Sequence, residues 1–217
     1  AGPLLHYRDL EPFRKVLEWG PPLVSFECID ESMPVSYVAI DHLHGMRQVI
    51  KHLADKGHTN IGYICCPDEI PAPNTRRHGF EKALFEMDIP TLGKNIIYGK
   101  GTYENGYTKA RQLIAQRPGD LPTALFCHSD ECAVGVLRAL DDVGISVPGD
   151  ISLVGYDNLQ ASQFSNPRIT SVGGSIEQLA ERLKNMLIEA IQGQSMEYKH
   201  ELVRPELIAR ESVASLR

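Results

Sequence analysis

Apolar and polar residues along the 217-residue chain follow two spacings, one typical of buried strands and one typical of amphipathic helices. Short apolar runs bounded by turn-forming residues predict strands, and apolar residues three or four positions apart predict helices. The predicted strands cover residues 22–26, 61–66, 95–98, 124–127, 151–156 and 169–172. The predicted helices cover residues 42–56, 74–87, 103–116, 130–143 and 176–192.

Strands and helices alternate as four consecutive β–α repeats between residues 61 and 156. Such alternation is typical of an α/β fold, in which helices cover both faces of a parallel sheet. Ser175 and Gln178 form a capping-box pattern at the start of the last long helix. Its expected apolar stripe comprises Ile176, Leu179, Ala180, Leu183, Leu187 and Ile191. Residues 197–210 alternate enough to predict one or two further strands.

Charge and hydropathy exclude several classes of protein. The chain carries 22 Lys and Arg against 28 Asp and Glu, a net charge of −6, and it has no basic block. This chain is therefore a poor candidate for binding the phosphate backbone of a nucleic acid by itself. The longest apolar runs, such as Ile151–Val154, are too short to span a membrane, and the start shows no signal-peptide pattern.

Cysteine usage favours the reducing cytoplasm, because the five cysteines are odd in number and lack the spacing of a disulfide framework. Cys127 and Cys132 flank His128, which raises the alternative of a metal site. A metal would still need a fourth ligand, and no CxxC pair is present. We therefore interpret these cysteines as small apolar core residues, and the sequence predicts neither a metal nor a cofactor.

Hydrogen-bonding side chains follow the predicted strands at their carboxyl ends, where open α/β sheets bind ligands. Glu27 follows the first strand, and Arg76 lies in the helix after the second. Ser129 follows the strand at 124–127, and Asp157 follows the strand at 151–156. Such an edge suits a small polyhydroxy or amide-bearing ligand. Each residue also has a plainer interpretation, since Ser129 could merely cap a helix and Glu27 could be an ordinary surface residue.

Catalytic patterns are weak. His128, Ser129 and Asp130 are the three residue types of a hydrolytic triad, but adjacent residues cannot face one another. The chain has no nucleophile elbow, phosphate-binding loop, zinc-protease motif or dinucleotide fingerprint. An acid/base enzyme that uses the carboxylates of Glu27, Asp130 and Asp157 stays a disfavoured alternative.

Five runs occur in order along the chain, namely GHTNI at 57–61, RRHGF at 76–80, SDECAVG at 129–135, VPGDISLVGYDN at 147–158 and LIARES at 207–212. Together they resemble motifs of the lactose-repressor/galactose-repressor family of bacterial transcription regulators. Each run is modest alone, but their order and spacing are similar to those of the family. The resemblance implies a type I periplasmic-binding-protein-like fold, in which two parallel-sheet α/β subdomains hold an effector between them.

The resemblance also implies where the subdomains divide. Residues 1–40 and 173–203 would form an incomplete amino-terminal subdomain, and residues 41–172 and 204–217 would form the carboxyl-terminal one. The helix-turn-helix of the family would lie outside this chain. Val134, on the helix at 130–143, would belong to a homodimer surface.

The family's effector contacts carry over residue by residue. Arg76 and Asp157 fall on the family's ligand-binding Arg and Asp, and Glu27 falls on an often acidic position. Ser129 replaces the usual Asn. Gly101 replaces a stacking aromatic residue, which suggests a bulkier ligand or another aromatic partner such as Tyr103 or Phe164.

The resemblance implies the effector-sensing part of a cytoplasmic repressor that is not an enzyme. A sugar or sugar derivative would bind and alter operator binding through the helix-turn-helix, and a nucleobase is the alternative effector. A solute-binding protein of a sugar transport system, without a DNA partner, is the alternative function.

Overall fold

The computed structural model describes residues 11–26, 34–65, 75–193 and 198–216. These residues divide into two compact units. Residues up to 41 and residues 174–204 belong to unit 1, whereas the described residues from 42 to 173 and from 205 onward belong to unit 2. The chain therefore passes from one unit to the other after Asp41, after Gly173 and after Arg204.

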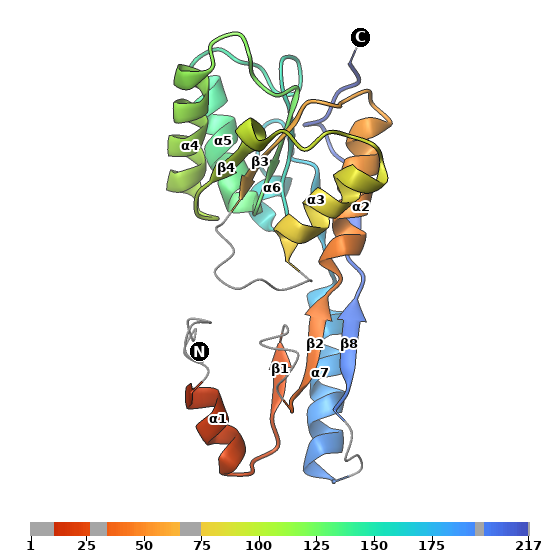
Figure 1. Ribbon diagram of the computed structural model, residues 1–217. Helices are drawn as coiled ribbons and strands as arrows, with labels where there is room; N and C mark the ends of the chain where they lie inside the picture. Colours follow the sequence, from red (N-terminus) through yellow and green to blue (C-terminus); the bar gives the residue numbers. More distant parts are fainter. Residues whose placement is uncertain (1–10, 27–33, 66–74, 194–197, 217) are drawn as a thin grey trace. The chain divides into compact units, whose positions relative to one another are not determined.

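Unit 2 contains a four-stranded parallel sheet in the order β4-β3-β5-β6. Its strands are β3 (Ile61–Cys65), β4 (Ile96–Tyr98), β5 (Ala124–Cys127) and β6 (Ser152–Val154). Its main helices are α2 (His42–Ala54), α3 (Arg76–Glu86), α4 (Tyr103–Gln116) and α5 (Asp130–Asp141). The predicted parallel α/β architecture is thereby confirmed, and Figure 1 shows α4 and α5 on one side of the strands with α2 and α3 on the other.

Alternation along the strands divides the core of unit 2 into two layers. Tyr63 and Phe126 point toward α2 and α3, where they pack with Phe80. Ile64 and Leu125 belong to the opposite cluster, which contains buried residues of α4 and α5. Successive strand residues face opposite sides of a sheet, so a continuous apolar strand buries both of its faces.

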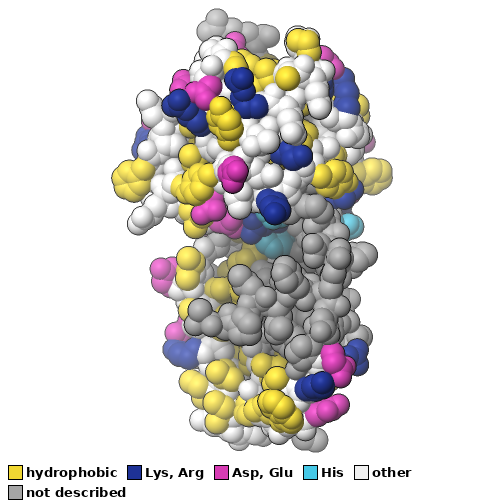
Figure 2. All heavy atoms as spheres, turned by 90° about the vertical axis from the view of Figure 1, so that its left-hand side faces the viewer, with side chains coloured by type: hydrophobic (Ala, Val, Ile, Leu, Met, Phe, Trp, Pro, Cys, Tyr) yellow, Lys and Arg dark blue, Asp and Glu magenta, His cyan; other side chains and the backbone are white. Residues whose placement is uncertain are grey.

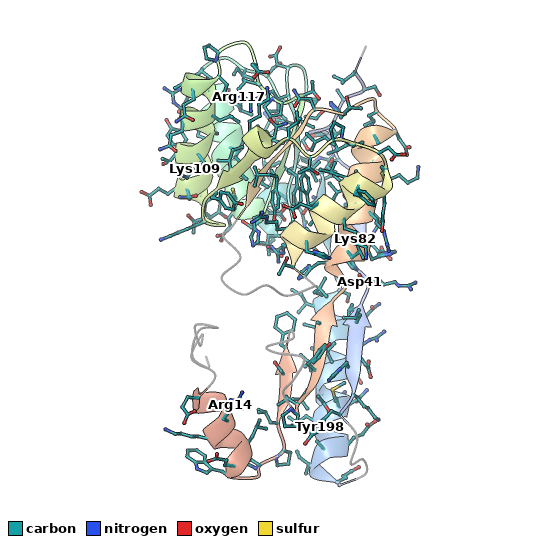
Figure 3. All side chains as sticks on the ribbon, in the orientation of Figure 1. Arg14, Asp41, Lys82, Lys109, Arg117 and Tyr198 are labelled. Carbon is teal, nitrogen blue, oxygen red and sulfur yellow. The ribbon has the colours of Figure 1, made fainter. Side chains whose placement is uncertain are left out.

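Short elements complete unit 2. A 3-10 turn, η1 (Gly93–Asn95), precedes β4, and α6 (Gln160–Gln163) follows β6. Strand β7 (Ser171–Gly173) pairs antiparallel with β9 (Glu206–Ile208). Arg117, labelled in Figure 3, caps α4 and joins its end to η1 by donating to the side chain of Asn95 at 2.9 Å.

Unit 1 has a parallel sheet in the order β1-β2-β8, made of β1 (Val24–Phe26), β2 (Ser36–Ile40) and β8 (His200–Val203). Helix α7 (Ile176–Ile191) packs against β1 and β2, and α1 (Glu11–Glu18) precedes β1. The α7 core residues are Leu179, Leu183 and Met186, which cluster with Val38 and Val203.

The predicted apolar stripe of α7 is only partly correct. Ser175 caps the helix as expected, by accepting from the Gln178 amide at 3.2 Å. Leu179 and Leu183 pack on the sheet, but Ile176 is 72% exposed and Ile191 is 64% exposed. Met186, which the pattern omitted, is buried instead, since the face of α7 is set by the short strands that it covers.

The predicted boundaries of these elements agree with the structure within two residues, and the larger of these differences have local causes. The strand predicted at 151–156 ends at Val154 because the chain turns through residues 155–158. The helix predicted at 74–87 starts at Arg76 because the side chain of Thr75 caps it. Among the described residues, no helix combines the length and the apolar character that crossing a membrane requires.

Candidate functional site

Arg76 and Asp157 form an ion pair at the carboxyl edge of the unit 2 sheet. Arg76 is the first residue of α3, and Asp157 follows β6. Arg76 Nη2 lies 2.6 Å from Asp157 Oδ1, and Arg76 Nη1 lies 3.4 Å from Asp157 Oδ2. The side chains are 19% and 32% exposed, so solvent still reaches part of both groups. The predicted convergence of these two residues is thus present in the structure.

Two further contacts fix the guanidinium of Arg76. Its Nη1 donates to the backbone carbonyl of His128 at 2.5 Å. Its Cζ lies 4.2 Å from the centroid of the Tyr156 ring, which is a cation–π geometry. Arg76 is therefore held by groups that follow two different strands, β5 and β6, and its planar fork is oriented before any ligand arrives.

Two histidine–tyrosine pairs flank this arginine. Tyr63 Oη lies 3.0 Å from His128 Nδ1, and Tyr156 Oη lies 2.8 Å from His42 Nδ1. Burial, followed by the nearby positive charge of Arg76, lowers the pKa of each histidine to about 3. Both imidazoles are therefore neutral at physiological pH and act as hydrogen-bonding groups without charge.

Asp157 lies in a turn with unusual backbone geometry. Its φ is +95° and that of Asn158 is +51°, so two successive non-glycine residues adopt left-handed conformations. Such residues cost about 1–3 kcal/mol each and persist where surrounding contacts hold them. The Asp157 amide donates to the carbonyl of Val172 at 2.7 Å, and the Asn158 amide donates to Ser171 Oγ at 3.1 Å.

Asp130 is fully buried beside this turn. Its Oδ2 accepts from the Leu159 amide at 2.6 Å and from Ser162 Oγ at 2.9 Å, and its Oδ1 accepts from Ser171 Oγ at 2.6 Å. Burial raises the pKa of Asp130 to about 6, although these hydrogen bonds oppose the shift. All three donors belong to unit 2, and this is the hydrogen-bonding pattern of a buried structural carboxylate.

Ser129 combines the capping role with a link to Gly101. Its Oγ accepts from the Cys132 amide at 3.1 Å and donates to the Gly101 carbonyl at 2.6 Å. The hydroxyl proton is thereby used, and only a lone pair remains for a ligand. A Cβ added at Gly101 would lie 3.3 Å from Ser129 Oγ, which places Gly101 directly against the start of α5.

The remaining predicted residues are not joined to this network by any contact that the structure gives. Phe164 caps the end of α6 and is 84% exposed. Tyr103, its alternative as a stacking group, is 46% exposed at the start of α4. Val134 is half-buried on α5 and packs partly on the core. Glu27 lies outside the described residues.

Sequence reasoning missed three members of the network, namely His42, Tyr63 and Tyr156. Their pairing joins residues 65 and 114 positions apart, and no sequence spacing reveals such contacts. The one available signal was Tyr156 itself, which directly precedes Asp157 at the end of a predicted strand.

Metal-binding groupings are not found in the described part of the chain, where no three His, Cys, Asp or Glu side chains are placed to hold an ion. Cys127 and Cys132 are free, fully buried residues of the core. Burial raises the pKa of the Cys127 thiol well above its ordinary value, as expected for an apolar core residue. Cys28 and Cys66 lie outside the described residues.

Charges around unit 2 are mixed in sign. Figure 2 shows Lys and Arg side chains interspersed with acidic and apolar ones on the visible face of this unit. Lys82 on α3, labelled in Figure 3, is exposed, as is the bidentate pair of Arg47 and Glu86. The described surface seen in this view therefore has no basic block, in agreement with the sequence.

Several known proteins that are similar to this chain are transcriptional regulators. A family profile described as "Periplasmic binding protein-like domain" matches residues 50–213. The chain is 35% identical over 204 residues to the HTH-type transcriptional repressor PurR of Haemophilus influenzae (strain PittEE). That match covers 93% of this chain and 57% of the repressor, so the chain spans little more than half of its relative's length.

Solved structures of regulators share the fold. The transcriptional regulator CelR in complex with cellobiose superposes with a TM-score of 0.86 and 31% identity, covering 96% of this chain and 63% of CelR. A LacI family regulator from Enterococcus faecium with bound ribose superposes with a TM-score of 0.81 and 25% identity, covering 94% and 75%. The chain belongs to the family of periplasmic binding protein-like domains, and it is similar over most of its length to transcriptional regulators that include members of the LacI family.

Proposed function

We propose that this chain is the effector-sensing part of a bacterial transcriptional repressor, and that Arg76 and Asp157 bind the effector. The observation that carries the proposal is the Arg76–Asp157 pair, which lies over Tyr156 at the carboxyl edge of the sheet. Relatives with this fold include repressors and a cellobiose-bound regulator. Their activity favours regulation over the transport alternative.

The proposed effector is a neutral, hydroxyl-rich molecule such as a sugar. The Arg76 guanidinium already faces a carboxylate and a carbonyl, so its charge is largely compensated before a ligand binds. The Asp157 carboxylate, 32% exposed, keeps lone pairs for ligand hydroxyl donors. A purine base is the alternative effector, because its N–H groups could use the same acceptors.

The other assignments follow the same proposal. Glu27, Ser129, Gly101 and Phe164 are proposed to line the ligand site, with Ser129 only as an acceptor. Val134 is proposed to contribute to a homodimer surface. Operator DNA would be bound by a helix-turn-helix elsewhere in the full protein, in the cytoplasm, and no catalytic step is assigned to this chain.

The test is a binding screen of the 217-residue chain by calorimetry and thermal shift, with cellobiose, ribose, sucrose, adenine, guanine and hypoxanthine as probes. Ligand bound to the native state raises the melting temperature. Asp157→Asn should abolish the shift, because the carboxylate is lost while the size of the side chain is kept. Glu86→Gln is the matched control, since Glu86 forms a bidentate pair with Arg47 at the opposite end of α3.

Two results would contradict the proposal. One is that none of the six probes binds the folded chain. The other is that Asp157→Asn and Glu86→Gln weaken binding equally. A purine that binds while the sugars do not would replace the sugar by the alternative effector, and the role of Asp157 would stand.

A further inference from the structure

The turn that carries Asp157 is held by hydrogen bonds to polar groups from several elements of unit 2. This Asp157 turn, residues 157–159, contains the two successive residues with positive φ. Each of its three amides has a separate partner. These partners are the Val172 carbonyl, Ser171 Oγ and Asp130 Oδ2.

We infer that Asp130, Ser171 and Arg210 are positioning residues that hold the Asp157 turn in the conformation in which its carboxylate meets Arg76. They come from three separate elements, namely the start of α5, strand β7 and the segment after β9. The inference deepens the proposed function, because it says what fixes the ligand-binding carboxylate.

Ser171 is the central link in this arrangement. Its hydroxyl donates to Asp130 Oδ1 at 2.6 Å and accepts from the Asn158 amide at 3.1 Å. Ser171 is fully buried, so water cannot readily replace either bond. Loss of this hydroxyl would leave the Asn158 amide without its partner, and it would also remove one of the three hydrogen bonds that the Asp130 carboxylate accepts.

Arg210 holds the side chain of the same turn. Its Nη2 donates to Asn158 Oδ1 at 2.6 Å, and its Nη1 donates to the Ile169 carbonyl at 2.6 Å. Nη1 also lies 3.3 Å from Ser162 Oγ, which in turn donates to Asp130. One connected network thus holds the backbone and the side chain of Asn158. Because Asn158 directly follows Asp157, this network also restrains the left-handed conformation of Asp157.

The buried side chain of Asp130 packs closely against the chain that precedes Asp157. A Cβ added at Gly155 would collide with Asp130 Oδ1, so the chain before Asp157 passes directly over this carboxylate. The Asp130 amide also donates to the Tyr156 carbonyl at 2.7 Å. Residues on both sides of Asp157 therefore contact the same aspartate.

The experiment compares Ser171→Ala with Ser152→Ala by amide hydrogen exchange of the whole chain, without ligand. Both serines are buried in unit 2, and each hydroxyl accepts a hydrogen bond from a backbone amide. The donor is the Asn158 amide for Ser171 and the Ala214 amide for Ser152. We expect exchange of the Asn158 and Leu159 amides to accelerate about tenfold or more in Ser171→Ala only, which is the effect of one lost buried hydrogen bond. Equal rates in the two variants would overturn the inference.

A second readout reports the position of Asp157 itself. In the wild type, the Arg76 Nη protons should give separate nitrogen-resolved NMR signals, assigned by their absence in Arg76→Lys, because the guanidinium is held by Asp157 and His128. Ser171→Ala and Asp130→Ala should broaden or merge these signals. Asp130→Asn should retain them in part, because the carboxamide oxygen of the new side chain can still accept from the Leu159 amide. Unchanged Arg76 signals in Ser171→Ala and Asp130→Asn alike would overturn the inference even if Asp130→Ala fails to fold.

Neither readout needs a ligand, so the outcome is separate from that of the binding screen. If no probe binds but the turn loosens as expected, the proposed function fails and the positioning network stands. If a probe binds and Asp157→Asn abolishes binding, but the turn does not loosen in Ser171→Ala, the reverse holds.

Discussion

The guanidinium carbon of Arg76 lies 4.2 Å from the centre of the Tyr156 ring, and the hydroxyl of the same ring lies 2.8 Å from His42 Nδ1. The ring of Tyr156 thus orients the proposed ligand-binding arginine, and its hydroxyl orients the buried, neutral His42. The two functions can be separated by substitution, because the ring and the hydroxyl are distinct groups.

Tyr156→Phe should leave ligand affinity nearly unchanged, whereas Tyr156→Leu should weaken it. The first change keeps the ring under Arg76, and the second removes the cation–π contact, worth about 0.5–2 kcal/mol or roughly 2- to 30-fold in affinity. Calorimetric titration with whichever probe stabilises the chain measures the difference. Equal losses in the two variants would show that the hydroxyl, and not the ring, holds the arginine.

Acid should destabilise unit 2 through His42 and His128. The pKa of each is about 3 in the folded chain and about 6.5 when unfolded, because burial and then Arg76 disfavour the charged ring. Above pH 6.5 both rings are neutral in the folded and in the unfolded chain. Between about pH 6.5 and pH 3 only the unfolded chain protonates them, so the free energy of unfolding falls as the pH drops, by roughly 1.4 kcal/mol per pH unit for each histidine. Urea unfolding at several pH values measures this slope.

The control for this slope is an exposed histidine. His128→Gln should remove the contribution of one histidine, and His78→Gln should leave the slope as in the wild type, because His78 lies on the outside of α3. A wild-type slope in His128→Gln would mean that other groups cause the acid sensitivity.

Asp130 should have the opposite effect on the pH dependence of the free energy of unfolding over the same pH range. Burial raises its pKa from 3.8 to about 6, so the folded chain holds this proton more tightly than the unfolded chain. The contribution is fully present below pH 3.8 and is lost as the pH rises through about 6. Asp130→Asn should therefore steepen the loss of stability between pH 6 and pH 4, measured as a difference from the wild type at matched pH. A shallower loss would contradict the assigned sign.

Close backbone contact between α4 and α5 should make Gly135 intolerant of any side chain. A Cβ at Gly135 would collide with the carbonyl oxygen of Tyr103, and one at Gly106 would collide with that of Cys132. Gly135→Ala should lower the free energy of unfolding by about 1–3 kcal/mol or more, since overpacking forces the helices apart. Gly93→Ala is the control, because nothing lies within 4 Å of its added Cβ. Thermal unfolding should give this variant a melting temperature close to that of the wild type.

Periodicity predicted the sheet and most helices, because strands of unit 2 are buried on both faces and their apolar runs are unmistakable. It predicted helix α7 but assigned part of its buried face wrongly, because Ile176 and Ile191 are exposed and a pattern of residue types cannot show which strands a helix covers. Arg76 and Asp157 could be predicted because each follows a strand at the same sheet edge. His42 and Tyr63 could not, because their pairing depends on side-chain packing between distant segments.

The interpretation of Ser129 shows the same limit at a single residue. Both sequence interpretations of this serine, helix cap and edge group, could be stated, but its bond to the Gly101 carbonyl could not. That bond depends on the loop after β4 lying against the start of α5. Loop placement of this kind follows from tertiary packing and has no counterpart in residue spacing.

The hydroxyl oxygen of Ser129 joins two separate segments of unit 2. Ser129 Oγ ties the first turn of α5 to Gly101, so a displacement of α5 along its axis would move the loop after β4 with it. Helices α4 and α5 also approach each other closely at Gly106 and Gly135, where an added Cβ would collide with the backbone of the facing helix. A partner that bound the outer face of α5 would therefore contact a helix whose first turn is joined by one hydroxyl to the loop after β4.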